Sequence, residues 1–178
     1  MLALPGLIAL MRYWSGWADA IDMYHPTGEW AVRWMVVALA MGPLASLIGA
    51  RPWLAWLIRR RRLFGLAAFG YAVAHLAFYV IDMGTFDEML GELPLPGIWT
   101  GWLALLLFAI PAAISSDRAM RGLGALWKPL QRFAWPAAAL AFAHWLIIGW
   151  GPWPAIVHFA PLIALFLIRF VPTGRKTI

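Results

Sequence analysis

Long apolar runs, separated by short charged connections, set the strongest limit on how this chain can fold. They cover residues 2–14, 30–49, 63–82, 97–114, 129–150 and 153–169. All but the first approach or reach the roughly 20 residues with which a helix spans a bilayer. Hydrophobic residues make up 63% of the 178 residues and charged residues only 12%, which is too apolar for a soluble domain.

These runs are expected to be helices, because lipid cannot bond to backbone N–H and C=O groups. The sequence therefore predicts an all-α, polytopic transmembrane bundle of about six segments, of which the first is short. We expect a single domain over residues 1–178, with its core at 30–170 and no separate soluble domain.

Charged residues change sign from one connection to the next. The basic connections hold Arg51, Arg59, Arg60, Arg61, Arg62, Arg118, Arg121, Lys128, Arg132, Arg169, Arg175 and Lys176. The other side holds Asp19, Asp22, Glu29, Asp82, Asp87, Glu88 and Glu92, and Asp117 is the one acid on the basic side. Since cytoplasmic loops carry an excess of Lys and Arg, we expect the basic side and the C-terminus to face the cytoplasm. The net charge of +6 thus indicates membrane orientation, with lipid and not nucleic acid as the partner.

Two histidines, His75 and His144, interrupt apolar runs at nearly the same depth. His75 lies seven residues before Asp82, or roughly 10 Å from the outer end, and His144 lies six residues before Trp150, roughly 9 Å from it. An ionisable side chain inside a membrane segment is a functional-site hypothesis by default. Two imidazoles at one level predict one metalloporphyrin held between helices, with His75 and His144 as ligands of the iron. The alternative is that each histidine bonds to a neighbouring helix and binds nothing.

Other polar residues near the outer face have weaker assignments. His158 is a further candidate for a ligand or a quinone contact, and the packed, non-binding alternative is favoured. His25 is expected at the interface, in a loop over 15–29. Arg12 and Arg33 break the charge rule, and two explanations are evenly balanced. They pair with propionates of the porphyrin, or they extend to outer lipid headgroups.

Small residues line the runs that carry the two histidines, and their purpose stays open. They include Gly65, Ala67, Ala68, Gly70, Ala72, Ala74 and Ala77 in one run and Ala137, Ala138, Ala139, Ala141 and Ala143 in the other. Such residues permit close helix packing or leave room for a flat macrocycle. Cysteine is absent, which excludes disulfides, thiolate ligands and cysteine-attached haem.

Three blocks of residues, spread over about 24–150, form a pattern of fixed order and spacing. The first block comprises Thr27, Gly28, Glu29, Trp30, Ala31, Pro43 and Leu44. The second comprises Arg61, Arg62, Leu63, Phe64, Gly65, Leu66, Ala68, Phe69, Gly70, Tyr71, His75, Leu76, Tyr79 and Asp82. The third comprises Ser115, Leu123, Gly124, Trp127, Leu130, Arg132, His144 and Trp145. Together these blocks resemble the MsrQ (YedZ) family of the ferric reductase-like transmembrane superfamily.

This resemblance implies a multi-pass b-type cytochrome of the bacterial inner membrane. Such a subunit passes electrons from quinol or a flavin-dependent donor to a periplasmic methionine sulfoxide reductase, and is not a self-sufficient enzyme. The positions that match the family's haem ligands are His75 and His144. A divergent relative that acts as a structural or pigment-associated subunit of a larger membrane complex is the alternative.

The chain departs from the family at Gln131, where the family pattern has histidine. Gln131 precedes His144 by thirteen residues, which places it roughly 20 Å lower along a helix. Glutamine is a poor ligand for haem iron, so we expect one haem b near the outer face. A second haem or a flavin mononucleotide on the inner side is not expected, while a quinone remains an open alternative.

Overall fold

The structure is a computed structural model, and it describes residues 1–49, 51–148 and 151–168. Its longer helices are α1 (Leu4–Trp14), α2 (Tyr24–Ile48), α3 (Pro52–Met83), α5 (Pro96–Ala113), α8 (Ala134–Ile147) and α9 (Pro152–Ile168). Short helices connect them, namely η1 (Ile21–Met23), α4 (Phe86–Glu92), α6 (Asp117–Leu123), η2 (Gly124–Leu126) and α7 (Trp127–Gln131). The described part of the chain contains no strand, which confirms the all-α prediction.

Each predicted apolar run is largely helical, and three helical segments have the length and composition of a membrane span. The three spans are Ile21–Ile48, Pro52–Met83 and Pro96–Ala113. Helix α9 is a shorter apolar helix, and α1 and α8 have 11 and 14 residues. The protein is therefore a helical membrane protein. The predicted ends of the fifth and sixth runs, Trp150 and Arg169, and the basic tail lie outside the described residues.

Proline and glycine mark the ends of several helices. Prolines 52 and 96 stand in the first turns of α3 and α5, where the fixed φ suits a helix and no N–H is lost. Helices α2 and α3 end at Gly49 and Gly84, whose φ values of 75° and 70° are costly for other residues. Local sequence thus accounts for where the long helices begin and end.

Two predicted connections are helical, and both predictions were wrong in the same way. Helix α2 begins at Tyr24, so His25 and Glu29 lie in the helix and not in a loop. The basic residues 59–62 lie within α3, which has 32 residues and a length of about 48 Å. This length exceeds the roughly 30 Å of a hydrocarbon core. The helix therefore continues past the predicted span and carries its arginines beyond it.

Two further boundaries differ from the prediction. The acidic connection contains α4, which Thr85 caps by accepting a hydrogen bond from the Glu88 N–H. The fifth run is not one helix from 129, because α7 ends at Gln131 and α8 starts at Ala134. Hydropathy averages over many residues. It therefore detects neither the cap that starts α4 nor the short break between α7 and α8.

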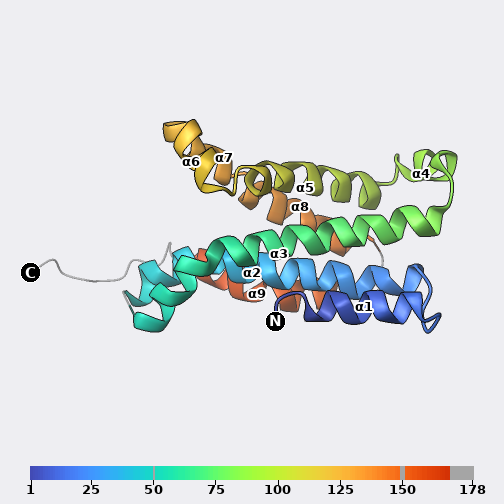
Figure 1. The fold of residues 1–178 in the computed structure, drawn as a ribbon, viewed down its shortest axis with the longest axis horizontal. Helices are drawn as coiled ribbons and strands as arrows, with labels where there is room; N and C mark the ends of the chain where they lie inside the picture. Colours follow the sequence, from blue (N-terminus) through green and yellow to red (C-terminus); the bar gives the residue numbers. More distant parts are fainter. Residues whose placement is uncertain (50, 149–150, 169–178) are drawn as a thin grey trace, which may run out of the picture.

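The long helices lie along one axis in antiparallel pairs (Figure 1). Helix α2 packs along α3, α5 packs along α8, and α9 lies against α2 and α8. The core between them is built from small and aromatic side chains, with Ala68, Ala137, Ala138 and Ala155 at most 3% exposed. Close approach of the backbones at these alanines supplies the packing that hydrophobicity alone cannot supply in lipid.

Opposite charges collect at opposite ends of the bundle, as the alternating connections predict. Helix α4 and the end of α3 form the acidic end, and α6, α7 and the start of α3 form the basic end (Figure 1). At the basic end, Arg62 of α3 hydrogen-bonds to Asp117 of α6. This bond and the charge of Arg62 lower the pKa of the Asp117 carboxyl. Asp117, the one acid on the basic side, is thus a partner for an arginine.

Tyr71 of α3 attaches the first helix to the bundle. Its hydroxyl accepts a hydrogen bond from the Gly6 N–H at 2.7 Å and donates one to the Leu2 carbonyl at 3.0 Å. The Gly6 N–H is one of the donors that the start of a helix leaves without an intrahelical partner. One hydroxyl therefore positions the N-terminal turn of α1 on α3.

Replacing Tyr71 by phenylalanine is expected to loosen this turn. Loss of the hydroxyl leaves a partly buried donor and acceptor without their partner, at a cost of about 1–3 kcal/mol. Faster amide hydrogen exchange at residues 4–7 would report the change. Tyr13→Phe is the matched control, because that ring contacts Phe78 while its hydroxyl bonds to no described residue. Equal exchange in both variants would contradict this role of Tyr71.

Candidate functional site

His75 of α3 and His144 of α8 lie side by side, although 69 residues separate them. Their ring centroids are 6.2 Å apart and their planes meet at 81°. Both side chains are partly buried, and each residue lies toward the C-terminal end of its helix. The depth argument predicts this meeting, since it rests on chain direction and helix rise alone.

A backbone carbonyl orients each imidazole. The Nδ1 atom of His75 is 2.9 Å from the Tyr24 carbonyl in the first turn of α2. The Nδ1 atom of His144 is 2.5 Å from the Gly97 carbonyl in the first turn of α5. A carbonyl can only accept, so both Nδ1 atoms carry the proton and both Nε2 atoms keep a lone pair. Metal-binding histidines in proteins are commonly oriented in this way.

A glycine four residues after each carbonyl lets the ring lie against the helix. A Cβ on Gly28 would be 3.2 Å from His75 Nδ1, and a Cβ on Gly101 would be 2.8 Å from His144 Nδ1 and Cε1. The two carbonyl–glycine pairs, Tyr24/Gly28 and Gly97/Gly101, have the same four-residue spacing. Residues four apart lie on one face of a helix, so each pair presents a bond acceptor and a flat surface to one histidine.

The separation of the rings suits an iron between them. Two imidazoles on opposite faces of one metal, with metal–nitrogen bonds of about 2 Å, place their ring centroids roughly 6 Å apart. The observed 6.2 Å agrees with this arrangement. The two free Nε2 atoms complete the donor set that a bis-histidine haem requires, so the residues fit the group.

A cavity of about 440 Å³ surrounds the two rings. This volume is within the range of ligand sites in proteins. Its walls come from α2, α3, α5 and α8, and small side chains of Ala72, Ala104, Ala137 and Ala141 make room in it. The open question about the small residues thus has two answers. Ala68 is fully buried in helix packing, whereas Ala72 and Ala141 line the cavity.

Two tyrosine–carboxylate pairs close the cavity at the acidic end. Tyr24 donates a hydrogen bond to Asp82 at 2.5 Å, and Tyr79 donates one to Glu92 at 3.0 Å. All four residues line the cavity. They connect α2, α3 and α4 directly above the histidine rings. The first pair also fixes Tyr24, whose carbonyl orients His75.

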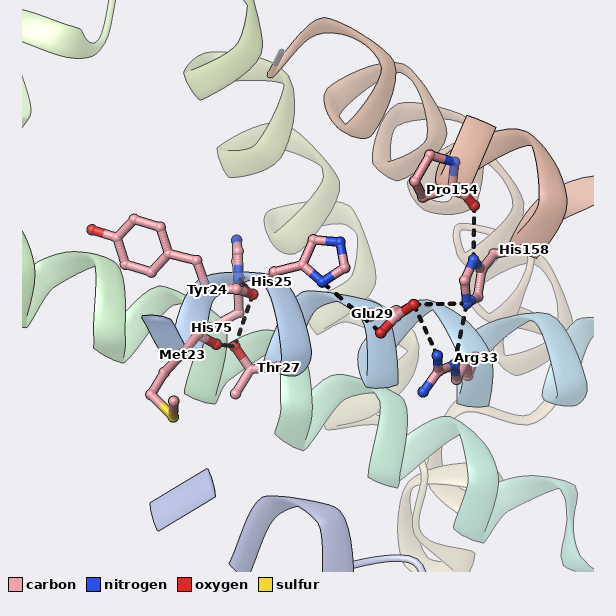
Figure 2. Close-up of polar contacts among 9 residues, drawn as sticks. All are labelled: Met23, Tyr24, His25, Thr27, Glu29, Arg33, His75, Pro154 and His158. Carbon is pink, nitrogen blue, oxygen red and sulfur yellow. Dashed lines mark hydrogen bonds and ion pairs between the residues drawn. The ribbon is translucent and has the colours of Figure 1, made fainter. Parts of the chain in front are cut away.

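A cluster of ionisable side chains joins α2 to α9 beside the cavity (Figure 2). Glu29 lies at its centre, 2.8 Å from Arg33 Nη2 and 3.2 Å from His158 Nε2. His25 Nδ1 is 3.9 Å from the other Glu29 oxygen. Glu29 and His25 line the cavity, whereas Arg33 and His158 do not. Glu29 was expected in a loop on the outer side, and this prediction was wrong, because Glu29 lies in α2.

Of the remaining predicted site residues, Arg33 and His158 meet in this cluster, whereas Arg12 does not join them. Arg33 donates through Nε to His158 Nε2 at 3.2 Å, pairs with Glu29 and lies 4.6 Å above the Trp30 ring. Arg12 on α1 is exposed and outside the cavity. The pairing of Arg12 and Arg33 with propionates stays a prediction. His158 packs against Trp145 at 5.1 Å between centroids, and its role also stays a prediction.

Gln131 lies at the opposite end of α5 from the histidines. Its Nε2 donates to the Pro111 carbonyl at 3.2 Å, whereas His144 bonds to Gly97. Fourteen residues of α5 separate these two carbonyls, or about 21 Å. The predicted depth difference between Gln131 and His144 agrees with this placement.

The sequence by itself did not indicate that Gly28, Gly97, Gly101 and Glu29 belong to the site. The spacing Gly97-x-x-x-Gly101 was a signal for close helix approach in a membrane. Glu29 had no such signal, because its importance depends on α9 lying beside α2.

Several curated proteins are similar to this chain over most of its length, and they share one name. A protein of Xanthomonas euvesicatoria pv. vesicatoria is 38% identical over 148 residues, which are 76% of this chain and 66% of the relative. One of Xanthomonas oryzae pv. oryzae is 38% identical over 79% of this chain and 70% of the relative. One of Pectobacterium carotovorum subsp. carotovorum is 34% identical over 94% and 86%. Each is named protein-methionine-sulfoxide reductase heme-binding subunit MsrQ. No protein-family model matches the chain.

Proposed function

This chain belongs to the MsrQ family, and we propose that it is a haem-binding electron-transfer subunit of a methionine sulfoxide reductase system. The observation that carries the proposal is the pair of histidine rings, 6.2 Å apart, with both Nδ1 atoms bonded to carbonyls. The names of the relatives agree with it. Haem b would supply a reversible one-electron couple in the membrane.

The protein's own residues position and shield this group. His75 and His144 would hold the iron through Nε2, because the carbonyls of Tyr24 and Gly97 occupy both Nδ1 atoms. The apolar wall of α2, α5 and α8 excludes water, which favours electron transfer over side reactions. The tyrosine–carboxylate pairs hold the helix ends in register above the site.

Location and partners follow from the orientation by charge. The basic end and the C-terminus would face the cytoplasm, and the haem near the acidic end would lie close to the periplasmic face of a bacterial inner membrane. A periplasmic reductase is then the acceptor, and a quinol in the bilayer is the nearest donor. Gln131 provides no ligand for an inner haem, so we propose one haem per chain and no flavin mononucleotide.

A haem spectrum with histidine variants tests the proposal. Protein purified from cells supplied with haem is expected to show a b-type reduced-minus-oxidised difference spectrum. In His75→Ala and His144→Ala the spectrum is expected to be lost, because each variant removes one of the two imidazoles that would hold the iron. The haem content per chain, measured by extraction, is expected to be one.

His25→Ala is the matched control, because His25 is a histidine of the same cavity with no assigned ligand role. It is expected to keep the spectrum. Wild-type protein without haem, in a preparation shown to be folded, would contradict the proposal and favour a structural subunit of a larger complex.

A further inference from the structure

His158 has two alternative sets of hydrogen bonds, which differ by one proton. Its Nδ1 is 2.7 Å from the Pro154 carbonyl, so Nδ1 carries a proton. Its Nε2 is 3.2 Å from Arg33 Nε and 3.2 Å from Glu29 Oε1. A neutral ring accepts from Arg33 through Nε2. A protonated ring donates to Glu29 through the same atom.

The groups around His158 suit either state. Helix α2 contributes Glu29 and Arg33, with His25 on the far side of Glu29 (Figure 2). Helix α8 contributes the Trp145 ring. A guanidinium nitrogen and a carboxylate oxygen both lie 3.2 Å from Nε2, so a hydrogen-bond partner is in place for each protonation state of the ring.

The cluster is structurally continuous with the histidine site. Glu29 lines the cavity and follows Gly28, on which the His75 ring lies. Trp145, which packs on His158, follows His144. An electron added between His75 and His144 makes the cavity one unit more negative, and this charge reaches the cluster through a medium of low polarity.

We propose that Glu29 and His158 form a proton-accepting pair, which binds one proton for each electron that enters the His75–His144 site. This inference rests on the proposed haem function. When the His75–His144 site gains one electron from the membrane donor, one proton from the outer aqueous phase would bind to His158 Nε2 and be held by Glu29. On reoxidation the electron passes to the acceptor and the proton returns to the solvent. The net charge of the site stays constant through the cycle.

Potentiometric titration of the haem-loaded protein at three pH values around neutrality tests the pair. In wild type the midpoint potential is expected to fall as pH rises, because a higher pH opposes proton binding. A tenfold change in proton concentration corresponds to at most about 59 mV for a one-electron couple. Glu29→Gln keeps the shape of the side chain without its charge, and His158→Gln keeps a polar side chain that cannot bind the proton. Both are expected to flatten this dependence.

Asp87→Asn is the control, because it removes an exposed carboxylate at the acidic end of the bundle, outside the cavity and outside the pair. It is expected to keep the slope. A flat wild-type profile, or a slope that survives both pair variants, would overturn the proposal while haem binding stands. Wild type without haem would overturn the proposed function and this inference together. If a pair variant fails to bind haem, the reduced-minus-oxidised infrared difference spectrum of the wild type tests whether a histidine is protonated on reduction. An imidazolium signal supports the pair, and its absence overturns it.

Discussion

Gly101→Ala is expected to weaken haem binding at least as strongly as any change outside the two ligands. The new Cβ would lie 2.8 Å from His144 Nδ1 and Cε1, which is closer than two such atoms can approach. Neither neighbour can yield easily, because the imidazole is rigid and its Nδ1 is bonded to Gly97. The ring must rotate or α5 and α8 must separate, at a cost of about 1–3 kcal/mol. This is roughly a five- to 150-fold loss of haem affinity.

Two other glycines complete a graded series. Gly28→Ala places a Cβ 3.2 Å from His75 Nδ1, and a milder loss is expected. Gly70→Ala is the control, since a Cβ there meets nothing within 4 Å and Gly70 lies on the exposed side of α3. This control is expected to bind haem normally and to gain about 0.5–1 kcal/mol of helix stability. Haem titration of the three variants measures the order, and equal affinity of Gly101→Ala and Gly70→Ala would contradict the role of the carbonyl–glycine pair.

Ala68→Leu is expected to destabilise the whole bundle. Ala68 of α3 is 0% exposed and belongs to the core in which the helices pack against one another. Three extra carbon atoms have no space there without displacement of α2, and such overpacking typically costs about 1–3 kcal/mol. Thermal unfolding in detergent, followed by circular dichroism, would show a lowered midpoint.

Ala77→Leu provides the comparison on the same helix. Ala77 is exposed on α3, so the larger side chain meets lipid or detergent and not another helix. Its unfolding midpoint is expected to stay near that of wild type. Equal midpoints for the two variants would mean that the α2–α3 contact at Ala68 contributes little to stability.

The depth of the two histidines was predictable, because it depends only on helix rise and on the direction in which each helix crosses the membrane. Helix rise and the alternation of charge are enough to place His75 and His144 at one depth, and the structure brings their rings together. The start of α2 was predicted six residues too late, because a charged residue such as Glu29 lowers the local hydropathy in the same way in a helix as in a loop. In the fold this carboxylate is helical and its charge is compensated by Arg33.

Segment type, membrane character, the two charged ends and the common depth of the two histidines were thus determined by the sequence itself, through hydropathy, charge and helix geometry. The tertiary structure alone decided which small residues serve packing and which line the cavity. It also decided that Gly28 and Gly101 lie under the two imidazoles, and that Glu29 meets His158. The physical reason is that these contacts depend on the rotation of each helix about its axis and on the choice of its neighbour. Glu29 and His158, which are 129 positions apart, meet only when helix rotation and helix neighbour are both fixed. No local sequence pattern encodes either of these two quantities.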